Sequence, residues 1–137
     1  MLLSARMLTD VQNVNSFEYV TVVTVTQGDT ANIYFQLIDS SVDLPTEGFS
    51  PPGRRFCPAA GSTLTVVMDS VFDNIKVTRS AVQAYPTLDA SIWYVPLLAS
   101  DTITGTVSFR FTLTQSGVVT RGSLQPALNI NPQQSFC

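Results

Sequence analysis

The sequence predicts an all-β protein, an antiparallel β-sandwich of seven or eight short strands in a single domain. Val, Thr and Ile together make up 38 of the 137 residues, and such β-branched side chains fit a pleated sheet better than a helix. Several segments alternate apolar and polar residues, and turn-forming residues separate these segments at short intervals. A small β-barrel is the alternative that the same pattern allows.

Residues 1–16 differ from the rest of the chain. Their large apolar residues recur at spacings of three or four, which is typical of one face of a helix. We expect these residues to form an N-terminal arm, and residues 17–137 to form the sandwich domain. The arm either docks on a neighbouring subunit or covers one end of its own domain. Its predicted contact residues are Leu3, Met7, Leu8, Val11 and Val14.

Two strands are predicted next, over residues 19–26 and 30–38. The first is a β-branched run that ends at the turn-forming sequence Q-G-D, in which glycine supplies a positive φ. The second alternates strictly between apolar and polar side chains, as a half-buried strand does. The residues expected on its buried face are Ile33, Phe35 and Leu37.

The irregular segment of residues 39–62 contains four prolines and three glycines. Proline removes a ladder donor and fixes φ, so this segment cannot be a central strand. Long loops commonly serve function or interfaces. Arg54, Arg55 and Phe56 lie in this loop, and the adjacent arginines could contact a phosphate or an acidic partner. The alternative is that they form a solvated loop tip.

The second half of the chain supplies the remaining strands. Residues 80–85 are ambiguous between strand and irregular chain, and Pro126 indicates that the last strand is an edge. A single Trp in a strand is most often a core anchor, although Trp93 could also lie at an interface. Strands are predicted over residues 63–68, 71–78, 91–98, 106–114, 118–121 and 124–130. The predicted core residues of these strands are Leu64, Val66, Trp93, Val107, Phe109, Phe111 and Leu113.

The composition excludes several classes of function. The chain is 45% hydrophobic but only 12% charged, its net charge is −3, and it contains no histidine. A basic nucleic-acid binder is not expected from this balance, and neither a Ser-His-Asp triad nor a histidine-ligated metal site can form. The aspartates occupy predicted turns and the glycines are scattered. We therefore expect a protein that is not an enzyme and that uses no cofactor and no metal.

Targeting and redox features are sparse. No run of about 18 apolar residues occurs, so no membrane contact is expected, and the polar residues near the start do not suggest a signal peptide. Cys57 and Cys137 are the two cysteines. We expect two free thiols, because nothing indicates an oxidising compartment. A bridge between them is the alternative, and it would close a loop of about 80 residues and add roughly 4–5 kcal/mol.

Two stretches resemble small β-sandwich proteins of tailed bacteriophage virions, including the N-terminal domain of upper baseplate proteins. The first is T-Q-G-D-T-A-N-I-Y-F-Q-L-I-D, residues 26–39. The second is D-A-S-I-W-Y-V-P-L-L-A-S-D-T-I-T-G-T-V-S-F-R-F-T-L-T-Q-S-G, residues 89–117. The resemblance covers about two thirds of the chain and implies an Ig-like sandwich. The N-terminal arm and the proline-rich insertion are not part of the family pattern.

The resemblance implies a virion structural protein of the tail, baseplate or head–tail neck, which acts through contacts between subunits. Its partners would be other virion proteins and copies of itself, without nucleic acid, and it would be assembled in the host cytoplasm. A capsid decoration protein is one alternative. A carbohydrate-binding or adhesin-like module is another, and its aromatic platform would use Trp93, Tyr94 and Tyr85.

Overall fold

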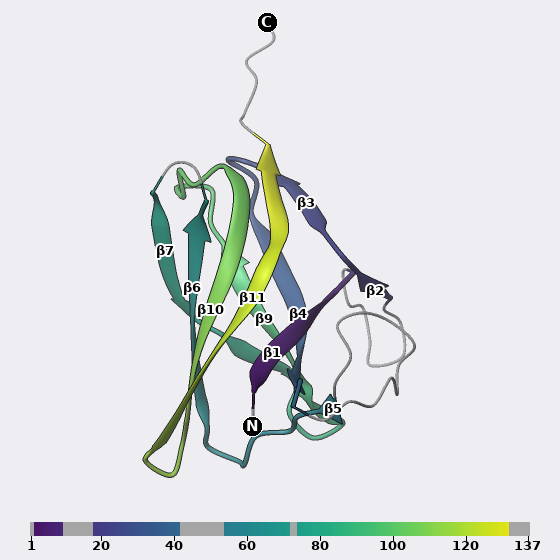
Figure 1. The fold of residues 1–137 in the computed structure, drawn as a ribbon. Coiled ribbons are helices and arrows are strands. Elements are labelled where there is room, and N and C mark those ends of the chain that lie inside the picture. The colour runs from purple at the N-terminus through teal and green to yellow at the C-terminus, as the bar shows by residue number, and fades with distance from the viewer. Residues whose placement is uncertain (1, 10–17, 42–53, 72–73, 132–137) are drawn as a thin grey trace, which may run out of the picture.

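The structure, a computed structural model, describes residues 2–9, 18–41, 54–71 and 74–131 (Figure 1). This part of the chain is all-β, as predicted, and contains no helix. Its strands are β1 (Leu3–Leu8), β2 (Tyr19–Val20), β3 (Val23–Thr26), β4 (Ala31–Asp39), β5 (Arg54–Arg55), β6 (Thr63–Ser70), β7 (Lys76–Ser80), β8 (Val82–Tyr85), β9 (Asp89–Leu97), β10 (Gly105–Gln115) and β11 (Val118–Asn131).

The strands form one continuous sheet in the order β7-β6-β10-β11-β1-β4-β9-β8, with β2, β3 and β5 paired beside this path. Figure 1 shows β6, β10 and β11 in front of β4 and β9, so the sheet folds over on itself at β1. The Phe35 and Phe111 rings, from β4 and β10, lie 5.3 Å apart between their centroids. The two halves therefore pack face to face around a shared core.

The prediction of a purely antiparallel sheet is wrong, because the sheet is mixed. β1 pairs in parallel with β11 through Leu3 and Gly122, and β3 pairs in parallel with the last four residues of β11. Both pairs join segments about a hundred residues apart, so no hairpin sets their direction. Alternation of side chains indicates a buried face but carries no information on the direction of the neighbouring strand.

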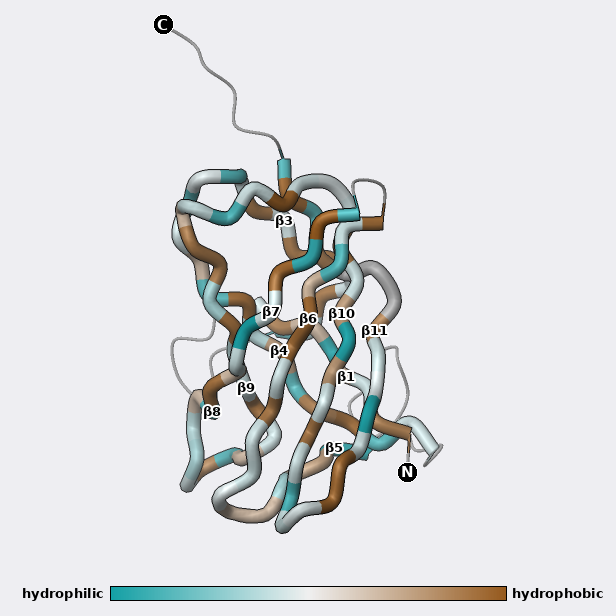
Figure 2. The backbone as a smooth tube through the Cα atoms, turned by 90° about the vertical axis from the view of Figure 1, so that its left-hand side faces the viewer, coloured by the Kyte–Doolittle hydropathy of each residue, from teal (hydrophilic) through white to brown (hydrophobic). Residues whose placement is uncertain are grey.

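All ten side chains predicted for the core are buried, with exposed fractions of 3% or less. They come from both halves of the sheet and belong to one apolar cluster. Figure 2 shows apolar and polar residues alternating along β6 and β10, which puts the apolar residues of these two strands on the inner face of the sheet. The ten are Ile33, Phe35, Leu37, Leu64, Val66, Trp93, Val107, Phe109, Phe111 and Leu113.

The prediction of a helical N-terminal arm is wrong over the residues that the structure describes there. Residues 3–8 form β1, which lies in the middle of the sheet between β11 and β4. Leu3, Met7 and Leu8 are buried within the chain's own fold, so they are not available to a partner. A spacing of four fits one face of a strand as well as one face of a helix, which explains the error. Val11 and Val14 lie outside the described residues.

The prediction that Pro126 marks an edge strand is also wrong, because β11 lies between β10 and β1. β11 is continuous over 14 residues where two strands were expected. Its register with β10 shifts between Val107 and Phe109, whose partners are Leu128 and Leu124. Pro126 thus falls in an irregular stretch of the ladder, one of the few places in a sheet that accept proline.

A tight hairpin joins β10 and β11 at Ser116 and Gly117. Gln115 pairs directly with Val118, so the loop has two residues. Ser116 and Gly117 both have positive φ, 48° and 81°, which is the requirement of a type I′ turn.

Candidate interaction surfaces

The predicted contact residues of the proline-rich loop lie in and after β5. Arg54 and Arg55 are exposed, and β5 pairs with the end of β4. Phe56 is half-buried against the core, and its backbone N–H donates to the Leu37 carbonyl at 3.0 Å. Phe56 therefore anchors the segment to the domain. Residues 42–53 of the predicted loop lie outside the described part of the chain.

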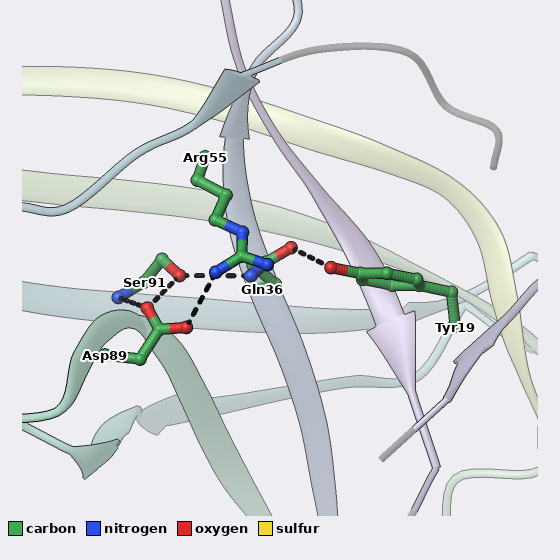
Figure 3. A network of polar contacts seen from close by, with 5 residues as sticks. All are labelled: Tyr19, Gln36, Arg55, Asp89 and Ser91. Carbon is green, nitrogen blue, oxygen red and sulfur yellow. Dashed lines mark hydrogen bonds and ion pairs between the residues drawn. The ribbon is translucent and has the colours of Figure 1, made fainter. Parts of the chain in front are cut away.

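A chain of polar contacts joins β2, β4, β9 and β5 (Figure 3). The Tyr19 hydroxyl donates to Gln36 Oε1 at 3.0 Å, and Gln36 Nε2 donates to the Ser91 Oγ at 3.2 Å. The Ser91 hydroxyl and backbone N–H both donate to Asp89 Oδ1. Arg55 Nη1 closes the chain with an ion pair to Asp89 Oδ2 at 3.4 Å.

This network has a structural role. Gln36 and Ser91 are fully buried, and the Gln36 side chain uses both its oxygen and its nitrogen within the network. A buried polar network with satisfied members fixes neighbouring elements in one arrangement. Here it ties the short strands β2 and β5 to the sheet. The ion pair with Asp89 fixes one nitrogen of the Arg55 guanidinium, and Arg54 beside it is exposed.

The chain's four tyrosines gather around the outer face of β4 and β9. Tyr34 and Tyr94 are direct cross-strand partners, with ring centroids 5.4 Å apart. Tyr19 and Tyr85 pack around buried Leu8 and Ile92 on the same face. All four rings are half-buried. We call this set the tyrosine face; sequence reasoning pointed to Tyr85 and Tyr94 but not to the other two.

A buried arginine lies beside the tyrosine face. Arg6 of β1 is only 1% exposed, and its guanidinium carbon lies 5.6 Å from the centroid of the Tyr19 ring, within the range of a cation–π contact. Trp93, the third predicted member of an aromatic platform, points into the core and is 3% exposed. The prediction that Trp93 belongs to an aromatic platform for carbohydrate is therefore wrong, because cross-strand pairing with Phe35 places the Trp93 ring on the inner face.

Asp39 lies at the end of β4, and its carboxylate accepts a hydrogen bond from the Leu2 backbone N–H at 3.2 Å.

A groove of about 530 Å³ opens between β3 and the first half of β4. Its walls are lined mainly by the valines of residues 20–25 and by Thr24, Thr30, Ile33 and Tyr34. None of its described lining residues is Asp, Glu, Lys or Arg. The groove therefore offers no ion-pair partner to a ligand, and its lining combines valines with hydroxyl and amide groups.

The edge strands of the sheet differ in how they are protected. Within the part of the chain that the structure describes, β3 pairs on one side only, with β11, and its four residues V-T-V-T carry no charge. The edge strand β7 carries Lys76 and Arg79, and the edge strand β8 has an irregular register with β9 between Gln83 and Tyr85. Charges and bulges are the usual devices that stop an edge from pairing with another chain. Among the described edge strands, the four-residue β3 and the two-residue β2 carry neither a charge nor a bulge.

The described residues hold no group of three or more Asp, Glu, Cys or His side chains that could bind a metal ion. No helix in the described ranges is long and apolar enough to cross a membrane. Cys57 is exposed and carries a free thiol, whereas Cys137 lies outside the described residues. Comparisons with models of protein families, with curated proteins and with solved structures found no match.

Proposed function

We propose that this chain is a non-catalytic structural subunit of a tailed-phage virion, and that it works through contacts with other subunits. The tail, the baseplate and the head–tail neck are the locations in the virion that this proposal covers. Its partners are other virion proteins and copies of itself, and it is assembled in the host cytoplasm. The phage setting rests on the resemblance of residues 26–39 and 89–117 to virion β-sandwich proteins.

The observation that carries the subunit role is the unprotected edge at β3. A strand without charge, proline or bulge is a hazard for a domain that stays alone, because it pairs with other chains. In an assembly, the same strand can pair with a strand of a neighbouring subunit, which then covers its edge. The low charge of the whole chain, 12%, points the same way.

We also propose that the fold is an Ig-like sandwich. In the variable-type Ig order, one sheet contains strands B, E and D and the other contains G, F, C and C′. The order β4-β9-β8 corresponds to the first set, and β11-β10-β6-β7 corresponds to the second. β1 and β3 take the place of a first strand that is shared between the two sheets, which accounts for the parallel pairs.

A test of the proposed function starts from particles of the native source. We expect quantitative mass spectrometry of purified particles to find this chain at a fixed number of copies per particle. Labelling with a specific antibody should then place it on the tail, baseplate or neck. Label confined to the capsid surface would favour the decoration alternative. Absence from particles while the chain is abundant in the producing cell would refute a virion role.

The tyrosine face supports a second candidate, a carbohydrate-binding or adhesin-like module. A tyrosine side chain combines a rigid apolar ring with a hydroxyl that can form hydrogen bonds, and tyrosines are enriched at binding surfaces. A glycan array with the isolated protein tests it, using Tyr94→Ala as the binding variant and Tyr85→Ala as a second. Saturable binding that both variants reduce would favour this candidate. Binding that neither variant changes would count against a sugar site on this face.

A further inference from the structure

We infer that the open edge of β3 is the contact through which two copies of this chain pair, strand to strand, about a two-fold axis. This inference deepens the proposed function and rests on it, since it names one partner of the subunit as a second copy. In Figure 1, β3 lies along the outer margin of the fold, above β2, with its free edge facing away from β11.

The side chains of β3 suit a neighbouring strand. Val23 and Val25 pack against the core, and Thr24 and Thr26 are exposed. Val22, directly before the strand, is 50% exposed. An added strand needs small, uncharged, alternating residues to continue both faces of the sheet, because its side chains stand beside those of β3. The groove next to β3 is equally free of charge.

A second copy of β3 meets these requirements in full. When two V-T-V-T strands pair in antiparallel fashion with Thr24 opposite its own copy, Val23 lies opposite the partner's Val25. Cross-strand partners share a face, so the valines of both copies stay on the core side and the threonines stay on the solvent side. The pairing is isologous and uses each open edge once, so it closes as a dimer and does not propagate.

The other edges of the fold are poor alternatives for this contact. The β7 edge carries two cations, Lys76 and Arg79, and a two-fold pairing that placed the Lys76 of one copy opposite the Arg79 of the other would be unfavourable. β8 departs from regular register, which hinders a continuous ladder. A strand from a different protein could also pair with β3, and the experiment below separates that case.

The test uses residue 24, which the pairing places on the two-fold axis. In the full chain with Cys57→Ser and Cys137→Ser, we expect Thr24→Cys to form a disulfide-linked dimer on mild oxidation, because paired strands bring Cα atoms within the range of a disulfide. Thr78→Cys, an exposed threonine on edge strand β7, is the matched control and should stay monomeric. Equal cross-linking of the two variants would overturn the inference.

Charge variants give an independent readout by sedimentation. Thr24→Lys and Thr24→Asp should each weaken dimerisation about fivefold, and an equal mixture of the two should dimerise as well as the unmodified chain. Circular dichroism verifies that each variant is folded; if Thr24→Lys does not fold, Val22→Lys replaces it. A chain that is monomeric at high concentration, or a dimer that is insensitive to these changes, would refute pairing between copies.

The two proposals can fail separately. A chain that is absent from particles but cross-links through Thr24→Cys would refute the virion role and keep the β3 pairing. A chain that is present in particles, with a β3 edge that cross-links only to another virion protein, would keep the role and refute the second copy as the occupant.

Discussion

Gly122 is the position where a single added methyl group should do the most damage to the sheet. It lies in β11 opposite Leu3 of β1, at the parallel contact that connects the two halves. A Cβ atom at residue 122 would lie 2.1 Å from the Leu3 carbonyl oxygen and 2.7 Å from the Leu3 carbonyl carbon. Both are backbone atoms, so rotation of a side chain cannot relieve the overlap, and β1 must move.

The cost of Gly122→Ala can be estimated from two contributions. Overpacking in a closely packed site costs about 1–3 kcal/mol. Displacement of β1 also endangers neighbouring contacts such as the hydrogen bond from the Ser4 hydroxyl to the Ser123 carbonyl, 3.1 Å, worth about 1 kcal/mol. We therefore expect a loss of about 2–4 kcal/mol in the free energy of unfolding. For a chain of this length that corresponds to a fall of about 10 °C in Tm.

Thermal and urea unfolding followed by circular dichroism measure this loss. Ser123→Ala is the matched control, because residue 123 is exposed and its backbone carbonyl, the acceptor for Ser4, remains. Its Tm should change by no more than about 2 °C. A Gly122→Ala protein that melts within the same margin would refute the close approach of β1 and β11, and with it the placement of residues 3–8 in the sheet.

Three further predictions follow from the core, the polar network and the end of β4. Phe109→Asp should abolish folding, because this ring is 1% exposed in the core and an isolated buried carboxylate is not tolerated; a soluble variant that melts cooperatively would contradict the register of β10. Gln36→Ala should lower the free energy of unfolding by about 2 kcal/mol, since it removes the acceptor of the Tyr19 hydroxyl and the donor to the Ser91 hydroxyl oxygen, whereas exposed Asn32→Ala should have little effect in the same urea titration. The Ser41 hydroxyl, with the backbone N–H groups of Ser41 and Leu2, holds the pKa of Asp39 below its usual value. A carboxyl whose pKa is lowered on folding stabilises the protein at pH values above its unfolded pKa. This contribution is lost as the pH falls through the folded pKa. Asp39→Asn should therefore reduce the fall in Tm below about pH 4, and an unchanged acid profile would show that the Asp39 contacts do not form.

The sequence was sufficient for the all-β class and for the core. Strict alternation at Ile33, Phe35 and Leu37, and again at Phe109 and its neighbours, predicts an inner face without reference to any partner strand. The turn between β10 and β11 has a similarly local signal, because the dipeptide Ser116-Gly117 marks a turn. In each case the information lies within about ten residues.

The errors concern contacts between distant segments. The spacing of Leu3 and Met7 fits a helix and a strand equally, and only the pairing of β1 with β4 and β11 decides between them. Pro126 indicated an edge, but a register shift in the β10–β11 ladder accommodates it inside the sheet. The tyrosine face was missed in part because Tyr19 and Tyr34 reach it from strands whose neighbours could not be predicted.

The central claim is that this chain acts as a subunit through its β3 edge, and one sedimentation experiment tests it most directly. The unmodified protein and Thr24→Lys are compared over a range of concentrations, alone and as an equal mixture of Thr24→Lys with Thr24→Asp. The account predicts a dimer for the unmodified chain, a shift toward monomer for Thr24→Lys, and recovery of the dimer in the mixture. A monomer at every concentration, or a dimer that ignores residue 24, would contradict it.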